Sequence, residues 1–319
     1  MPTKSLPAML MAATSLIAVT ACSAGAADGE STSAATAQSG DTVSITVSTY
    51  PLEFIATRIG GQAAQVNNIA PAGTEPHDLE LAPADIAVLG GSDVVVTLAR
   101  FQPAVDDALT QIEGPTVLDA AAFADLIEPA ADAEHSEEEY SEDDGHDHGD
   151  LDPHFWLDPM RVANVADALA ETLSDIDPSN AGAYTDNAAQ LRADLEDLDA
   201  RFREGLTGCA SDDFVTSHEA FGYLAHAYQL HQIGISGIDP ESEPSPARVA
   251  DVLQQARDAE ATTVFAQPGG LTAGADVIAD ELGLTLATLD PIELQPADSD
   301  YLGAMTANLA ALREGLACP

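Results

Sequence analysis

The chain has 319 residues, 45% of them apolar, so it is long enough and apolar enough to form more than one folded core. Acidic residues outnumber basic ones by 54 to 10, and the formal net charge is −44. A surface with this charge repels phosphate groups and anionic lipids, which excludes nucleic-acid binding. The charge favours cations without locating a site, and most of these carboxylates are interpreted as a solubility or high-salt adaptation of the surface.

The N-terminus, residues 1–22, has the layout of a signal peptide. Lys4 precedes the apolar run 8–21, which ends at Cys22. A membrane-spanning helix needs about 20 residues, so this run is too short to cross a bilayer comfortably. Small residues before a cysteine resemble a bacterial lipobox, and we expect cleavage before Cys22 and its lipidation; ordinary secretion with cleavage nearby is the alternative. Residues 23–41 are predicted to form a flexible tether.

Residues 42–158 alternate between strand and helix patterns. Strands are predicted at 43–48, 65–70, 93–98 and 116–118, with helices at 52–60, 84–90 and 102–112. This alternation is typical of a mostly parallel sheet flanked by helices, so we expect an N-terminal α/β lobe. Within it, residues 133–150 contain acids, serine and three histidines and nothing to bury, which predicts a loop.

Residues 159–206 have a helical pattern that is interrupted once, at Asp177-Pro178, where Asp177 can cap and Pro178 can begin a new helix. The second part carries an apolar stripe at spacings of four and three, formed by Tyr184, Ala188, Leu191, Leu195, Leu198 and Phe202. We expect two lobes to pack on this linking helix, which should restrain hinge motion between them.

Residues 207–319 return to the alternation. Strands are predicted at 214–216, 232–237, 262–266 and 284–289, and helices at 220–230, 246–259, 273–282 and 301–316. The sequence therefore predicts an α/β protein of two lobes, each with a mostly parallel sheet flanked by helices, joined by a long backbone helix.

Four candidate metal ligands lie in short motifs near predicted strand ends or before the linking helix: His77, His154, His218 and Asp290. In open α/β sheets, ligands bind outside the carboxyl ends of the strands. A lone histidine at such a place is more often a cap or core residue. Three imidazoles and one carboxylate at equivalent edges need a common cause, however, and a closed tetrahedral metal site supplies one.

Other residues near these motifs receive secondary roles. Glu219 follows His218 directly and could orient a metal ligand through a hydrogen bond. His226 and His231 are interpreted as structural. If Cys22 is used for the lipid anchor, Cys209 and Cys318 remain as an even pair in an oxidising compartment, and we expect a disulfide between them, with two unpaired buried thiols as the alternative.

The four motifs resemble the ligand motifs of one family, the solute-binding lipoproteins of bacterial ABC transporters for zinc and manganese. They read Gly-Thr-Glu-Pro-His-Asp at 73–78, Asp-Pro-His-Phe-Trp-Leu-Asp-Pro at 152–159, Thr-Ser-His-Glu-Ala-Phe-Gly-Tyr at 216–223 and Leu-Asp-Pro at 289–291. The resemblance covers nearly everything after the tether. One departure is Gln267, where relatives often carry glutamate, which puts an auxiliary carboxylate there in doubt.

The resemblance implies two α/β lobes bridged by a long helix with the metal between them. It implies a non-enzymatic monomer that is held outside the cytoplasm by a lipid anchor in the cell membrane and delivers its metal to an ABC permease and the ATPase of that permease. Imidazole ligands suit Zn²⁺ better than Mn²⁺, and manganese binders of the family often have a carboxylate where this chain has His218. Zinc is therefore expected, with manganese as the alternative.

Two rival functions remain open. A zinc metallohydrolase usually keeps three protein ligands and an open water position, whereas Asp290 as a fourth ligand would close the site. The zinc-protease motif also needs a second histidine where Gly222 stands. The other rival is a surface adhesin that uses the metal as a structural staple.

The acidic loop contains His135, His146 and His148 and resembles the histidine-rich loop of zinc-type family members, although it is poorer in histidine. Either it collects zinc weakly and passes it inward, or it is a solvated spacer.

Deleting residues 134–150 is expected to leave the zinc affinity of the main site unchanged, because the four candidate ligands lie outside the deleted segment. Competition titration against a zinc chelator measures this affinity. A large loss would show that the loop contributes to the main site.

Overall fold

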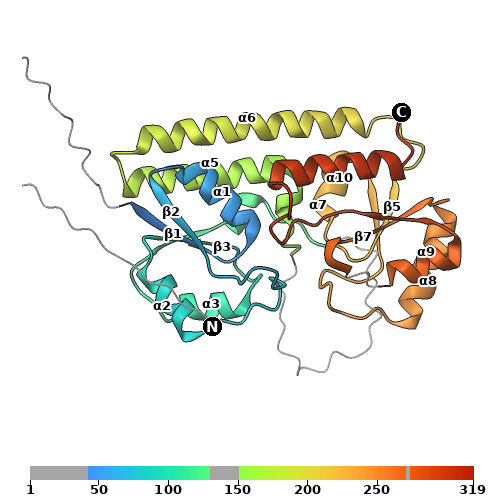
Figure 1. Cartoon of the computed structure of the whole chain (residues 1–319), viewed down its shortest axis with the longest axis horizontal. Coiled ribbons are helices and arrows are strands. Elements are labelled where there is room, and N and C mark those ends of the chain that lie inside the picture. The colour runs from blue at the N-terminus through green and yellow to red at the C-terminus, as the bar shows by residue number, and fades with distance from the viewer. Residues whose placement is uncertain (1–41, 130–150, 271–273) are drawn as a thin grey trace, which may run out of the picture. The chain divides into compact units, whose positions relative to one another are not determined.

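The computed structural model describes residues 42–129, 151–270 and 274–319 (Figure 1). The predictions for Cys22, the tether and the loop histidines His135, His146 and His148 lie outside these ranges. Residues Asp41–Pro319 form one compact unit. No helix in the described ranges combines the length and the apolar character that crossing a bilayer requires.

The N-terminal lobe contains a four-stranded sheet in the order β2-β1-β3-β4, in which all neighbours are parallel. Its strands are β1 (Val43–Val47), β2 (Ala64–Asn68), β3 (Val94–Thr97) and β4 (Thr116–Asp119). Its helices are α1 (Tyr50–Gly60), α2 (Pro83–Gly91), α3 (Pro103–Leu109) and the short α4 (Ala121–Ala124), which the sequence did not predict.

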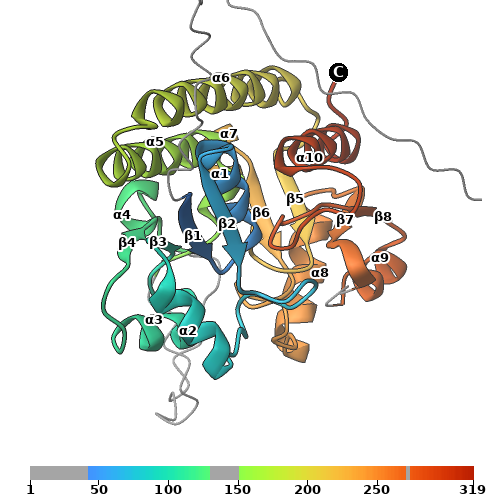
Figure 2. The same ribbon diagram turned by 60° about the vertical axis from the view of Figure 1, so that its left-hand side comes forward.

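Helices cover both faces of this sheet, as the side chains of β3 show. Val94 and Val96 join the apolar cluster that includes α1, whereas Val95 packs on the opposite face with Leu89 of α2 and Ala108 of α3. A strand buried on both faces reads as a continuous apolar run, which is why 94–96 is all valine. Figure 2 shows α1 on one side of β1–β3 and the α2–α3 pair near the other.

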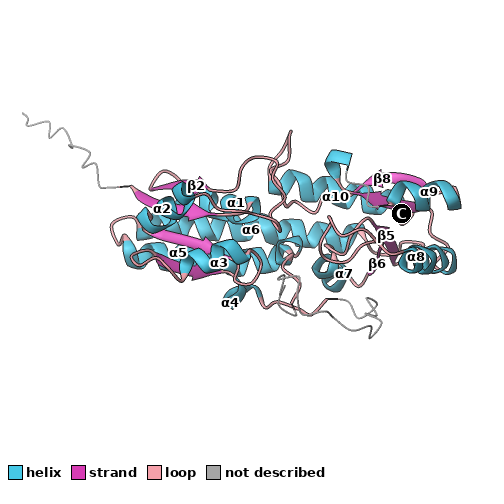
Figure 3. Ribbon diagram, turned by 90° about the horizontal axis from the view of Figure 1, so that it is seen from below, coloured by secondary structure: helices cyan, strands magenta, loops and turns pink. Residues whose placement is uncertain are grey.

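The C-terminal lobe repeats this arrangement, with strand order β6-β5-β7-β8 and all neighbours parallel. Its strands are β5 (Asp213–Thr216), β6 (His231–Gly234), β7 (Thr263–Ala266) and β8 (Thr285–Thr288). Its helices are α7 (Gly222–Tyr228), α8 (Pro246–Asp258), α9 (Ala275–Leu282) and α10 (Tyr301–Gly315), with the 3₁₀ turn η2 (Pro268–Gly270); another 3₁₀ turn, η1 (Phe155–Leu157), ends the N-terminal lobe. Figure 3 shows the strands of each lobe among helices. The predicted fold class is confirmed.

Two helices, rather than one interrupted shaft, connect the lobes: α5 (Pro159–Ile176) and α6 (Ala181–Gly205), which pack side by side (Figure 1). Asp158 caps α5 by accepting a hydrogen bond from the Met160 N–H. The predicted start of the second helix at Pro178 is wrong, because Asp177 ends α5 and its carboxylate accepts bonds from Asn180 at 2.6 Å and the Tyr184 hydroxyl at 3.1 Å. Because residues 178–180 form this turn, α6 begins at Ala181 and not at Pro178.

The predicted apolar stripe on α6 is confirmed, since the six residues that form it are the buried residues of that helix. The stripe packs in one apolar cluster that also contains Ile45 and Val96 of the first sheet and Phe214 and Phe265 of the second. Helix α6 contacts both α1 and α10. The two lobes therefore share a continuous hydrophobic core.

The predicted disulfide is confirmed. Cys209, in the loop after α6, is bonded to Cys318, which follows α10, across a sequence separation of 109. The bond joins the chain end to the beginning of the C-terminal lobe. The alternative of two unpaired thiols is wrong.

Replacing both cysteines, Cys209→Ser with Cys318→Ser, is expected to lower the free energy of unfolding by about 2–5 kcal/mol, because the cross-link restricts the unfolded chain over a long loop. Urea denaturation measures the change. As a control, a reducing agent should destabilise the wild-type protein but not the double variant. An unchanged unfolding midpoint in the double variant would contradict the prediction.

Candidate metal centre

Three histidines and one glutamate meet where strands end. The Oε1 atom of Glu293 lies 2.9 Å from His154 Nε2, 3.3 Å from His218 Nε2 and 3.7 Å from His77 Nε2. All four residues are buried, with exposed fractions of 5% or less. The ligand atoms of His77, His154 and Glu293 all lie within 4.8 Å of one another. Three imidazole nitrogens and one carboxylate oxygen thus face one point, which is the donor set of a tetrahedral metal site.

His77 lies in the loop between β2 and α2, and the two residues directly before α3, Phe101 and Gln102, hold this loop in place. The Gln102 side-chain amide donates to the Pro76 carbonyl at 2.9 Å and to the Ser48 carbonyl at 3.2 Å, which ties the loop to the end of β1. The Phe101 ring packs edge-on against the His77 ring with centroids 4.8 Å apart. A buried amide and an aromatic ring therefore restrict where His77 can point.

His154 precedes η1, and its ring orientation is set by Asp152. The Asp152 Oδ1 atom accepts a hydrogen bond from the His154 backbone N–H at 2.9 Å and lies 2.8 Å from its Nδ1. A carboxylate at Nδ1 favours the proton on that nitrogen, which leaves Nε2 facing Glu293. The sequence analysis did not assign this role to Asp152. Its position, two residues before His154, is nevertheless one from which a carboxylate can reach back to the backbone and ring of that histidine.

His218 directly follows β5, the second strand from one edge of its sheet. The Thr216 hydroxyl and the Gln232 side-chain amide each donate to the His218 carbonyl at 2.8 Å, which fixes the backbone at the strand end. Its Nε2 faces Glu293, and its Nδ1 is buried without a hydrogen-bond partner in the described part of the chain.

Glu293 is the residue that sequence reasoning missed. It follows β8 within Leu289-Asp290-Pro291-Ile292-Glu293. Ile292 has a positive φ of 58°, an uncommon conformation for a β-branched residue, and this sharp turn lies directly before Glu293. The Trp156 indole N–H holds the turn from the other side by donating to the Pro291 carbonyl at 2.8 Å.

The predicted ligand Asp290 lies nearby but has other partners. Its Oδ1 atom accepts the Ile292 N–H at 2.8 Å, and the side chain of Asn308 on α10 bonds both the N–H and the carbonyl of Asp290, at 2.8 and 2.7 Å. Among the described residues, the group of ligand atoms around His77 and His154 that lie within 4.8 Å of one another contains Glu293; Asp290 is outside it, as is His218, but His218 Nε2 faces Glu293 and Asp290 has other partners. Asp290 therefore shapes the turn that presents Glu293.

The charges in this cluster depend on one another. Burial lowers the pKa of His154, but Asp152 and Glu293 outweigh burial and raise it to about 9. Burial also lowers the pKa of His218, and Glu293 only partly opposes this. Burial raises the pKa of Glu293, but its hydrogen bonds with His154 and His218 and the nearby His77 outweigh burial and hold the pKa well below its usual value. Both pKa shifts favour an ionised Glu293 paired with a protonated His154 when no metal is bound.

The other predicted residues lie around this cluster. Glu219, the residue after His218, is mostly buried. Its Oε1 atom lies 3.1 Å from the guanidinium of Arg248 on α8, and this ion pair holds its side chain in place. Gln267, after β7, is also buried.

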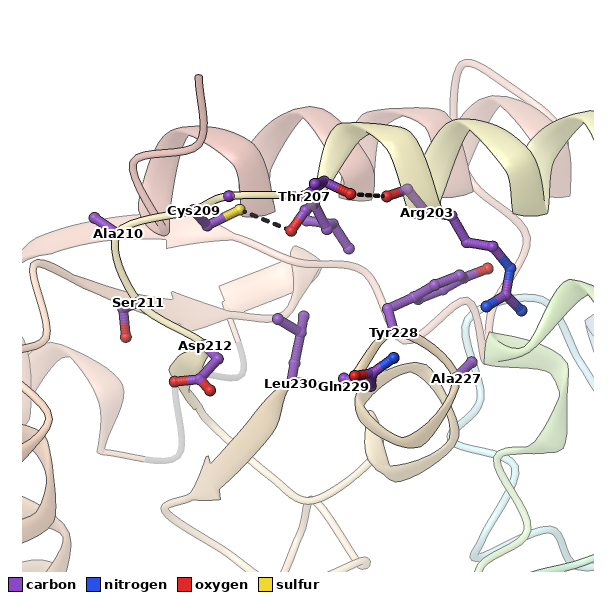
Figure 4. A pocket seen from close by; sticks show the side chains of 12 residues that line it. Arg203, Thr207, Cys209, Ala210, Ser211, Asp212, Ala227, Tyr228, Gln229 and Leu230 are labelled. Carbon is purple, nitrogen blue, oxygen red and sulfur yellow. Dashed lines mark hydrogen bonds between the residues drawn. The ribbon is translucent and has the colours of Figure 1, made fainter.

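Two further features lie apart from the cluster. Asp212, Asp213 and His231 have ligand atoms within 4.8 Å of one another, but they are wholly or partly exposed, and the register that pairs Asp213 with His231 accounts for their proximity. A pocket of about 610 Å³ lies beside Cys209 (Figure 4). It is lined by Arg203 and by residues 206–212 and 227–230. Its lining contains neither Glu293 nor the three site histidines.

Comparison with known proteins identifies relatives. Residues 45–315 match the family model described as zinc-uptake complex component A, periplasmic (ZnuA). The chain is 30% identical over 281 residues to the zinc-binding lipoprotein AdcA of Streptococcus pneumoniae R6, covering 85% of this chain and 55% of AdcA. It is 30% identical over 301 residues to the high-affinity zinc uptake system protein ZnuA of Bacillus subtilis 168, covering 91% and 93%.

Solved structures show the same fold. The laminin-binding protein Lbp of Streptococcus pyogenes superposes with a TM-score of 0.73 and 28% identity, covering 86% of this chain and 99% of Lbp. The Zn(II)-bound AdcA of Streptococcus pneumoniae gives 0.72 and 27%, covering 86% and 58%. The chain thus spans just over half the length of AdcA, and nearly all of the Bacillus ZnuA. From the match over residues 45–315, the chain belongs to the ZnuA family of zinc-uptake components.

Proposed function

We propose that this protein captures Zn²⁺ outside the cytoplasm and delivers it to the permease of an ABC importer. The observation that carries the proposal is the convergence of His77, His154, His218 and Glu293 on one buried point. Family membership supports the same cargo, as do the descriptions of AdcA as a zinc-binding lipoprotein and of ZnuA as a zinc uptake system protein. We further propose that these four side chains are the zinc ligands, with Glu293 in place of Asp290.

The donor set favours zinc over manganese. Three neutral imidazoles and one carboxylate match the nitrogen-rich tetrahedral sites of Zn²⁺, whereas Mn²⁺ prefers oxygen ligands and binds most weakly in the divalent series. The chain's own residues prepare the site: Asp152 turns the Nε2 atom of His154 toward the centre, and Glu293 is held ionised by the histidines around it. On binding, zinc displaces the proton of His154 and becomes the partner of Glu293.

The same set of four donor atoms argues against a zinc metallohydrolase. A catalytic zinc keeps an open position for water or substrate, whereas four buried protein ligands fill a tetrahedral shell. Lbp is described as laminin-binding, so adhesion is the more serious rival. Growth of a deletion strain under zinc limitation separates the two, because loss of an importer component impairs growth there and loss of an adhesin does not.

The variants Glu293→Gln and Asp290→Asn test which carboxylate binds zinc. Both remove one negative charge with almost no change of shape, at positions three apart in one turn. Glu293→Gln is expected to weaken zinc binding by about 100-fold or more, since losing a ligand should cost at least as much as losing its outer partner. Asp290→Asn is expected to bind nearly as tightly as wild type. Competition titration decides, and the reverse order would make Asp290 the ligand.

Zinc affinity is expected to rise with pH between about 6 and 9. The pKa of His154 is raised to about 9, so this histidine holds a proton below that pH, and zinc must displace it. Each displaced proton weakens the affinity about tenfold per pH unit as pH falls. Calorimetry in buffers with different ionisation enthalpies counts the released protons. An affinity that stays flat from pH 9 to 6 would contradict the ligand assignment.

A further inference from the structure

The hydroxyl of Tyr223, in the C-terminal lobe, bonds the backbone of two residues of the N-terminal lobe. Tyr223 is on the first turn of α7, shortly after His218, and its side chain is fully buried. Its hydroxyl donates to the Asp152 carbonyl at 2.5 Å and accepts from the Ile127 N–H at 3.0 Å. These two residues stand on either side of the acidic segment 133–150 in the sequence.

The hydroxyl completes a pair of backbone hydrogen bonds. The Asp152 N–H donates directly to the Ile127 carbonyl at 2.9 Å. In an antiparallel pair the return bond would run from the Ile127 N–H to the Asp152 carbonyl. Here the tyrosine hydroxyl is inserted in that return bond and serves both groups. Without it, two backbone groups at this position would lose their partner.

The neighbouring residue, Gly222, packs against the side chain of Asp152. A Cβ atom on Gly222 would come within 2.8 Å of Asp152 Oδ2, so the bare backbone of α7 packs directly against the carboxylate that orients His154. The Arg161 guanidinium stacks over the Tyr223 ring at 4.9 Å and restricts the ring from the α5 side. Asp152 is therefore fixed at its carbonyl and at its carboxylate by two consecutive residues of the opposite lobe.

We propose that Tyr223 is a positioning residue of the metal centre, which together with Gly222 fixes Asp152 and through it directs the His154 Nε2 atom toward the ion. Because α7 begins shortly after His218, this contact also sets the position of the N-terminal ligand His154 relative to the C-terminal ligand His218. The inference rests on the proposed function, since it concerns the affinity of that site for zinc.

Two variants test it, each with a matched control. Tyr223→Phe removes only the hydroxyl, and Tyr228→Phe removes a hydroxyl from the same helix away from Asp152. Gly222→Ala adds a methyl against the Asp152 carboxylate, and Gly182→Ala adds one where no atom lies within 4 Å. Tyr223→Phe and Gly222→Ala are each expected to weaken zinc binding by about 10-fold or more, the usual effect of losing an outer partner of a ligand. Both controls should bind as wild type.

Further readouts separate positioning from general destabilisation. In imidazole ¹⁵N spectra of the zinc-loaded protein, wild type should show His154 bound through Nε2, and Tyr223→Phe should change the His154 signals while Tyr228→Phe leaves them unchanged. A lower thermal midpoint of metal-free Tyr223→Phe with unchanged zinc affinity would overturn the proposal, as would an equal loss in Tyr228→Phe. If Tyr223→Phe does not fold, Gly222→Ala decides alone. Failure of the wild-type protein to bind zinc would instead refute the proposed function.

Discussion

A carboxylate buried away from water is stable only where hydrogen bonds or opposite charge replace its lost hydration, and Glu293 meets this requirement with three imidazoles. The histidines come from a loop after β2, the segment before η1 and the end of β5, so the compensation draws on both lobes. The arrangement is balanced for a cation. With a protonated His154 it is internally paired, and with a divalent ion the same atoms can act as ligands.

Three of the four cluster residues, His77, His154 and Glu293, are positioned by neighbours whose own places are fixed by hydrogen bonds. Gln102 ties the His77 loop to β1, Asp152 orients His154, and Trp156 and Asn308 hold the turn before Glu293. These supports are hydrogen bonds between buried groups, which are costly to leave unmade. The polar contacts around the histidines are therefore as specific in their geometry as the four converging side chains, and two of the residues that make them, Gln102 and Asn308, lie outside the four motifs.

The sequence predicted the features that depend on local periodicity. Strand and helix alternation predicted both parallel sheets, and the spacing of apolar residues on α6 predicted its buried face residue by residue. The histidines could be found because each lies in a short motif that follows a strand or precedes a helix. The choice between Asp290 and Glu293 could not be made, because it depends on a positive φ at Ile292 and on Asn308, which lies on another helix. The role of Tyr223 could not be predicted either, because its partners Ile127 and Asp152 come from the opposite lobe.

The shared core has a consequence for how an ion could enter. Apolar side chains from both sheets and from α6 belong to one cluster. Swinging the lobes apart as rigid bodies would expose part of that surface to water, at a cost of roughly 25 cal/mol for each Å². The turn before Glu293 carries the same penalty, because Leu289 and Ile292 belong to the cluster, whereas residues 71–80, which carry His77, contribute no residue to it. A movement of that loop alone would leave the shared core intact, whereas separating the lobes would not.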